Sequence, residues 1–139
     1  MPQQDVVNLV VEGIAQAQGS MVASAAGKVH HAGGGKLSNW RKTIGWTAKA
    51  AMRTQPLTGP LVVYLHFTLP GDASKPATRP PDLDKLARAV LDALTGIVWV
   101  DDAQVAQLVA VKVYGPTPRV TIDVSEERGW ADAAVSIPR

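Results

Sequence analysis

The chain has 139 residues, a length that suits a single domain with a core of its own. Its content of 46% hydrophobic residues excludes a largely disordered chain, and the lack of cysteine excludes a disulfide scaffold or a thiolate metal site. The N-terminus has no basic leader and no apolar run approaches the roughly 20 residues of a membrane span, so we expect a cytoplasmic protein that does not enter the membrane.

The net charge of +2 is unevenly distributed. Residues 1–60 hold six basic and two acidic side chains, a balance of +4, whereas residues 61–139 hold eight basic and ten acidic side chains, a balance of −2. A basic half beside an acidic half suits a metal-dependent enzyme that acts on a polyanion, because the basic residues attract phosphates. On charge alone, ordinary surface charge explains the pattern equally well.

The first 54 residues predict a strand, a loop and a helix. The β-branched run 6–11 predicts a buried strand, which ends at Gly13. Residues 15–35 are rich in glycine and alanine and predict a loop. Residues 36–54 predict the first helix, with Ser38 as its N-cap.

On that helix, Trp40 and Ile44 lead an apolar stripe that predicts the buried side. We expect both Trp40 and Trp46 in the core, because a tryptophan in a helix is more often buried than free to stack on a base. The basic residues lie mainly off the stripe and form either a solvated face or a DNA-binding one. Lys36 and Arg41 are our candidate DNA contacts on this segment.

The second half of the chain predicts three more strands and one more helix. Residues 61–69 predict a strand, and the proline-containing loop 70–81 that follows it offers Arg79 as a phosphate contact. Residues 105–114 and 119–124 predict two strands, which we expect to form an antiparallel hairpin.

This order of elements predicts an α+β fold, an α/β two-layer arrangement in which one mixed sheet is covered by two helices. We place the domain at residues 1–125. The polar, alanine-rich stretch 126–139 is expected to be a tail that is either partly disordered or a short helix.

The second helix carries the chemistry. Two prolines directly before Asp82 favour extended backbone and tolerate a helix start just after it, so we expect the helix to begin near Leu83. Asp82 and Asp84 then lie at the helix entrance, and a further pair, Asp101–Asp102, follows the helix. Carboxylate clusters are what hard divalent ions such as Mg²⁺ require. Taken singly, each acid also has a structural explanation as a helix cap or a turn residue.

Residues 82–104 carry a dense pattern of charged and polar residues. Its members are Asp82-Leu-Asp84, Arg88, Asp92-Ala-Leu, Asp101-Asp102 and Gln104. This pattern resembles the signature of the RusA family of Holliday-junction resolvases, whose spacing it fits without a gap. The family has asparagine where Lys85 stands and lysine where Arg88 stands. Arginine keeps the charge and the ability to hold phosphate, but it does not readily give up a proton.

The resemblance implies an endodeoxyribonuclease that resolves four-way DNA junctions by paired phosphodiester cuts in recombination and repair. It also implies Mg²⁺ or Mn²⁺ as the cofactor, a homodimer with two active sites, and a bacterial protein or a phage protein in a bacterial host. The catalytic residues that it implies are Asp82, Asp84 and Asp102 as metal ligands, with Arg88 on the phosphate and Asp101 and Asp92 in support.

The residues that we expect to contact DNA are Lys36, Arg41, Arg79, Lys85 and Lys112. Two other functions remain open from the sequence. One is a non-catalytic module that binds branched DNA, and the other is a nuclease that acts on other branched DNA.

Overall fold

The computed structural model describes residues 5–19, 21–23, 29–31 and 34–127. The predicted tail therefore lies outside the described residues from residue 128 onward. In chain order the elements are β1 (Asp5–Glu12), β2 (Met21–Ala23), β3 (Val29–His31), α1 (Gly34–Ala51), β4 (Leu61–Pro70), α2 (Leu83–Leu94), a 3₁₀ turn (Asp102–Gln104), β5 (Val105–Gly115) and β6 (Arg119–Glu126).

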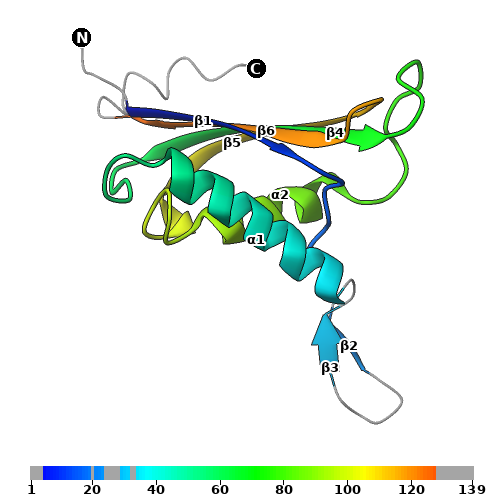
Figure 1. Ribbon diagram of the computed structural model, residues 1–139, viewed down its shortest axis with the longest axis horizontal. Coiled ribbons are helices and arrows are strands. Elements are labelled where there is room, and N and C mark those ends of the chain that lie inside the picture. The colour runs from blue at the N-terminus through cyan, green and yellow to red at the C-terminus, as the bar shows by residue number, and fades with distance from the viewer. Residues whose placement is uncertain (1–4, 20, 24–28, 32–33, 128–139) are drawn as a thin grey trace.

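The main sheet has four strands in the order β1-β6-β4-β5. β4 pairs antiparallel with β6 and parallel with β5, and β6 pairs antiparallel with β1, so the sheet is mixed. Both α1 and α2 lie on one face of this sheet (Figure 1). The predicted α+β fold, with two helices over one mixed sheet, is confirmed.

The strand β4 lies in the interior of the sheet because it is the most continuously apolar segment of the chain. Every second residue of β4 faces the helices and is at most 3% exposed; these are Leu61, Val63, Leu65, Phe67 and Leu69. An apolar run stabilises the fold most in a strand that is paired on both edges and covered on one face, because there it buries the most apolar surface. The predicted hairpin of β5 with β6 is wrong, since β4 lies between them.

The helix α1 begins and ends earlier than predicted, at Gly34 and Ala51. Ser38 is therefore inside the helix and is not its N-cap. Trp40 and Ile44 are buried as expected, at 5% and 0% exposed, but Trp46 is 70% exposed and its predicted place in the core is wrong. Two residues of helix turn the chain by about 200°, so a residue two positions after Ile44 points away from the core.

The segment predicted as a loop at residues 15–35 contains a short hairpin. β2 and β3 pair antiparallel, with Val22 opposite His30. Valine favours extended backbone, and a valine lies in each of the two strands. Ahead of the hairpin, Ala15 is buried and the backbone N–H of Gln18 donates to the carbonyl of Lys85 at 2.9 Å. This part of the chain is thereby attached to α2.

Close packing at the end of β4 predicts a clear effect of one small substitution. A Cβ added at Gly71 would lie 2.6 Å from Cδ1 of Tyr114, so we expect Gly71→Ala to lower the free energy of unfolding by about 1–3 kcal/mol. Gly35 in α1 is the matched control, because a Cβ there meets nothing within 4 Å and alanine favours a helix. Urea unfolding of both variants checks this, and equal stabilities would contradict it.

Candidate active site

The acidic helix begins where the sequence predicts. α2 spans Leu83–Leu94, and its buried side presents Leu86, Ala87, Ala89, Val90 and Leu94 to the core. Asp84 and Arg88 lie one turn apart and are both exposed. Burial of the apolar stripe thus turns the charged residues of the first two turns outward.

Asp82 occupies the N-cap position of α2, but its side chain makes no capping hydrogen bond. Its Oδ2 atom lies 4.0 Å from Nζ of Lys85, and both side chains are largely exposed. An exposed ion pair at this distance contributes little to stability. The structural explanation for Asp82 as a helix cap therefore has no support in its contacts, and its carboxylate is available to a ligand.

The entrance of α2 is held against the sheet by Lys112. The ammonium of Lys112, on β5, donates to the carbonyls of Arg79 at 3.0 Å and of Pro81 at 2.8 Å. Two of its three N–H donors thus fix the backbone directly before Asp82. We expected Lys112 to contact DNA; the structure gives it this positioning contact, which no local sequence pattern signals.

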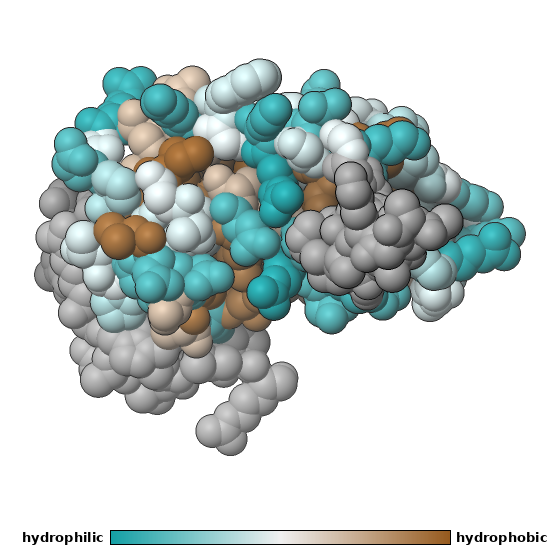
Figure 2. Space-filling model, turned by 90° about the horizontal axis from the view of Figure 1, so that it is seen from below, coloured by the Kyte–Doolittle hydropathy of each residue, from teal (hydrophilic) through white to brown (hydrophobic). Residues whose placement is uncertain are grey.

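A hollow of about 550 Å³ lies beside the helix entrance, between the loop after β4 and Tyr114. Lys75 and Arg79 line it. Within this loop the hydroxyl and the backbone N–H of Ser74 donate to Asp72 at 2.7 and 2.9 Å, and these two hydrogen bonds lower the pKa of Asp72. Seen from the helical side, this end of the molecule is covered by hydrophilic residues (Figure 2). The surface beside Asp82 suits a phosphate backbone.

Asp101 and Asp102 have different environments. The side chain of Asp101 caps the 3₁₀ turn by accepting from the backbone N–H of Ala103 at 2.9 Å. Asp102 is exposed, and its side chain makes no hydrogen bond or ion pair with the described residues. The side chain of Asp101 is thus engaged in a local hydrogen bond, whereas that of Asp102 is not.

Gln104 anchors this acidic turn to the rest of the fold. Its Oε1 accepts from the backbone N–H groups of Val100 and Asp101 at 3.0 and 2.8 Å. Its Nε2 donates to the carbonyls of Leu57 and Gly59 at 2.9 and 3.0 Å. One side chain therefore joins the turn to the segment before β4 through four hydrogen bonds.

Within one chain, the two groups of predicted metal ligands lie far apart. Asp102 precedes the start of β5, whereas the entrance of α2 is bound to Lys112, seven residues beyond that start, or roughly 23 Å along an extended strand. Figure 1 shows the turn and the entrance at opposite ends of α2. Among the described residues, no three His, Asp or Glu side chains gather closely enough to hold a metal ion. Asp82 and Asp84 thus lie at the entrance of α2, whereas the turn that carries Asp102 lies beyond the other end of the helix.

Asp92 and Arg41 join the two helices. Nη1 of Arg41 lies 3.9 Å from Oδ2 of Asp92 and donates to Oε1 of Gln18 at 3.4 Å. The predicted DNA contact Arg41 is thereby engaged with α2, while Lys36 is exposed at the start of α1. Arg88 is exposed and forms no ion pair within the described part of the chain.

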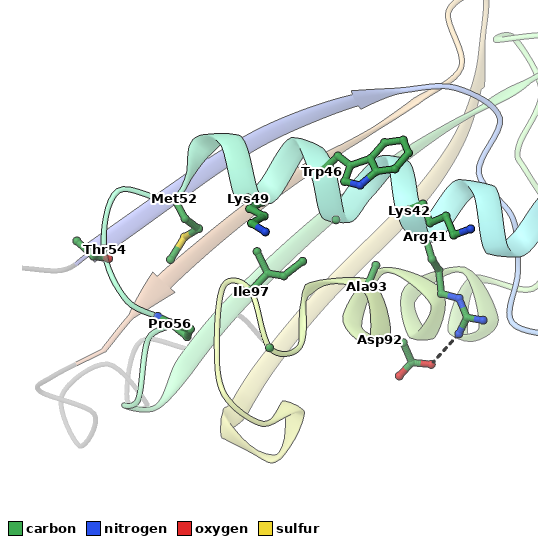
Figure 3. Close-up of a pocket in the computed structure, with 12 residues that line it drawn as sticks. Arg41, Lys42, Trp46, Lys49, Met52, Thr54, Pro56, Asp92, Ala93 and Ile97 are labelled. Carbon is green, nitrogen blue, oxygen red and sulfur yellow. Dashed lines mark ion pairs between the residues drawn. The ribbon is translucent and has the colours of Figure 1, made fainter.

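A second, larger groove was not predicted from the sequence. It has a volume of about 750 Å³ and runs between α1 and the end of α2. Lys42, Trp46 and Lys49 come from α1, and Ala93 and Ile97 lie opposite (Figure 3). The helical spacing of Trp46 relative to Ile44 is the signal that would have placed it on this outer side.

The fold and the site define an α+β domain in which an acidic helix entrance lies beside cationic surfaces suited to a phosphate backbone. The family described as "Endodeoxyribonuclease RusA" matches residues 16–125. The chain therefore belongs to the RusA family, which confirms the resemblance and indicates endodeoxyribonuclease activity.

A relative with a related sequence comes from a bacterium. It is "Uncharacterized protein YqaN" of Bacillus subtilis (strain 168), which is 28% identical over 139 residues, covering 88% of this chain and 97% of the relative. Its source agrees with the bacterial or phage setting expected above. Within the described residues, neither helix combines the length and the apolar character needed to cross a membrane.

Proposed function

We propose that this protein is a Mg²⁺-dependent endodeoxyribonuclease that resolves four-way DNA junctions by paired cuts. The observation that carries the proposal is the entrance of α2. There Asp82 stands at an N-cap position without a capping bond, two residues before the exposed Asp84. Lys112 holds this entrance in place, and the cationic hollow lies next to it.

Asp82 and Asp84 would hold the ion. Mg²⁺ in proteins is commonly bound by one or two carboxylates together with waters and substrate phosphate, so this pair fits it, and Mn²⁺ accepts the same oxygen ligands. When bound, such an ion activates water and neutralises charge on the phosphodiester. Arg88, one turn after Asp84, would hold a phosphate through two hydrogen bonds. Lys75 and Arg79 would position the strand that enters the hollow.

Asp102 would complete the site from a second copy of the chain. One chain separates it from Asp82 by the length of α2, whereas a homodimer with twofold symmetry brings opposite ends of two subunits together. β5 is an edge strand, and Leu108 and Val111 on it are each 42% exposed. Antiparallel pairing of two β5 edges would place Asp102 of the partner subunit near the entrance of α2.

Cleavage of a labelled four-way junction tests the proposed activity. We expect paired symmetric nicks in Mg²⁺ and none when Ca²⁺ replaces it. Asp84→Asn should lower the cleavage rate at least about 100-fold. Changing a residue that only orients a metal ligand typically costs about 10–100-fold in activity, and removing a ligand should cost more. Junction binding should persist in this variant, since the DNA-binding cations are unchanged.

Asp123→Asn is the matched control, because Asp123 lies on the sheet face away from the helices. This variant should cut like the unaltered protein. Junction binding without nicks in any metal would instead identify a non-catalytic DNA-binding module. Equal cleavage of flaps and junctions would identify a nuclease for branched DNA in general.

A further inference from the structure

We propose that Trp46, Lys42 and Lys49 form a binding site for an unpaired DNA nucleotide, with its base stacked on the indole and its flanking phosphates on the two ammonium groups. The inference rests on the proposed function in that DNA is the substrate. It assigns a second contact region, at the other end of α2 from Asp82, and binding there requires neither metal nor cleavage.

The exposure of Trp46 is unusual within this structure. Trp40 and Trp99 are 5% and 0% exposed, whereas Trp46 is 70% exposed. A tryptophan buries more apolar surface than almost any other side chain, so leaving one in water forgoes a large contribution to folding. An exposed indole bordering a groove is therefore a candidate for a contact that forms on binding.

The two lysines make the groove suitable for a nucleotide in particular. Lys42 lies four residues before Trp46 and Lys49 lies three residues after it, so all three project from the same side of α1. Both lysines are exposed and form no ion pair with the described residues, unlike Arg41, which pairs with Asp92. The Cα atoms of the two lysines are about 10 Å apart along the helix axis, and that of Trp46 lies between them.

The groove next to the indole has room for a base. Its volume of about 750 Å³ lies within the range of small-molecule sites, and Ile97 and Ala93 form an apolar wall opposite α1. A Cβ at Gly45 would lie 3.3 Å from Cδ1 of Ile97, so this wall approaches α1 closely beside Trp46. An aromatic platform with flanking cations is how proteins hold single strands without reading their sequence. Paired bases in a duplex do not offer the face that an indole stacks on.

The test compares two single strands bound by the full-length protein with a chelator present, so that no strand is cut. One is an oligothymidylate of roughly 12 nucleotides, and the other has the same backbone with abasic positions throughout. The unaltered protein should bind the oligothymidylate at least about fivefold more tightly than the abasic strand, and its tryptophan fluorescence should be quenched on binding. Trp46→Ala should remove this preference and the quenching.

Two further variants separate stacking from a general effect on the protein. Trp46→Phe should keep most of the preference, because phenylalanine also stacks, while it loses the quenching that depends on the indole. Lys42→Ala should weaken the binding of both strands and reduce its salt dependence. Tyr64→Ala is the matched control, since Tyr64 is an aromatic side chain that is 42% exposed on the opposite face of the sheet. This variant should keep both the preference for the oligothymidylate and the fluorescence quenching.

Three results would overturn the proposal. Trp46→Ala could weaken the binding of both strands equally, which would show that its effect does not depend on the bases. It could leave the preference intact, which would place the stacking elsewhere. It could convert a dimer into a monomer, which would assign the groove to contact between copies of the chain.

Discussion

A mixture of the Asp84→Asn and Asp102→Asn proteins should nick a four-way junction that neither protein cuts alone. The expectation follows from the separation of the two acidic groups, which lie at opposite ends of α2 in one chain. If a site takes Asp84 from one subunit and Asp102 from the other, a mixed dimer contains one intact site and one doubly altered site.

The size of the effect follows from random exchange of subunits. Half of the dimers in an equal mixture are mixed and each has one intact site of two, so about a quarter of all sites should be active. These dimers should make single nicks rather than paired cuts, which a denaturing gel of a junction labelled on each strand distinguishes.

The control mixture pairs Asp82→Asn with Asp84→Asn. These residues lie at the same helix entrance, so no subunit exchange can rebuild a site that needs both, and the mixture should stay inactive. Restored cleavage in this control, or none in the first mixture, would contradict a site shared between subunits.

Replacing Gln104 by leucine should lower the free energy of unfolding by about 2–4 kcal/mol. The amide makes four hydrogen bonds to backbone groups, and a typical bond of this kind contributes about 0.5–1.5 kcal/mol. Leucine has a similar size but leaves all four groups without this partner. Junction cleavage should fall as well, because the turn that carries Asp102 loses its attachment to Leu57 and Gly59.

Gln107→Leu provides the matched control for this prediction. Gln107 is also a half-buried glutamine on the segment from the turn into β5, but its side chain makes no hydrogen bond with the described residues. The same substitution there should change stability by less than about 0.5 kcal/mol. Equal midpoints of denaturant unfolding for the two variants would show that the four bonds of Gln104 do not carry the effect.

The helix α2 could be predicted from sequence because its signals are local. Two prolines keep the backbone before Asp82 extended, so the helix begins after them. Apolar residues at steps of three and four define its buried side from Leu83 to Leu94. The same residues also predict that Asp82 and Asp84 lie at the entrance of this helix. The family signature is equally local, since it lies within residues 82–104, and it led to a family assignment that the match over residues 16–125 confirms.

The order of the strands could not be predicted in the same way. Residues 105–114 and 119–124 are separated by a short turn, which favours a hairpin on local grounds. The competing arrangement pairs both segments with β4, a strand more than 30 residues away from β5 in the sequence. The apolar run of β4 is more fully buried when both of its edges are paired. The residues of the short turn carry no information about the burial of β4.

Composition, local periodicity and spacing thus determined the two helices, the four long strands, the two-layer class and the acidic entrance of α2, because each depends on neighbours along the chain. Only the tertiary structure decided that Lys112 positions Asp82, that Gln104 anchors the turn of Asp102, and that this turn lies far from the helix entrance. The physical reason is that these contacts join residues distant in sequence, whose meeting is set by how β4 is inserted between β5 and β6.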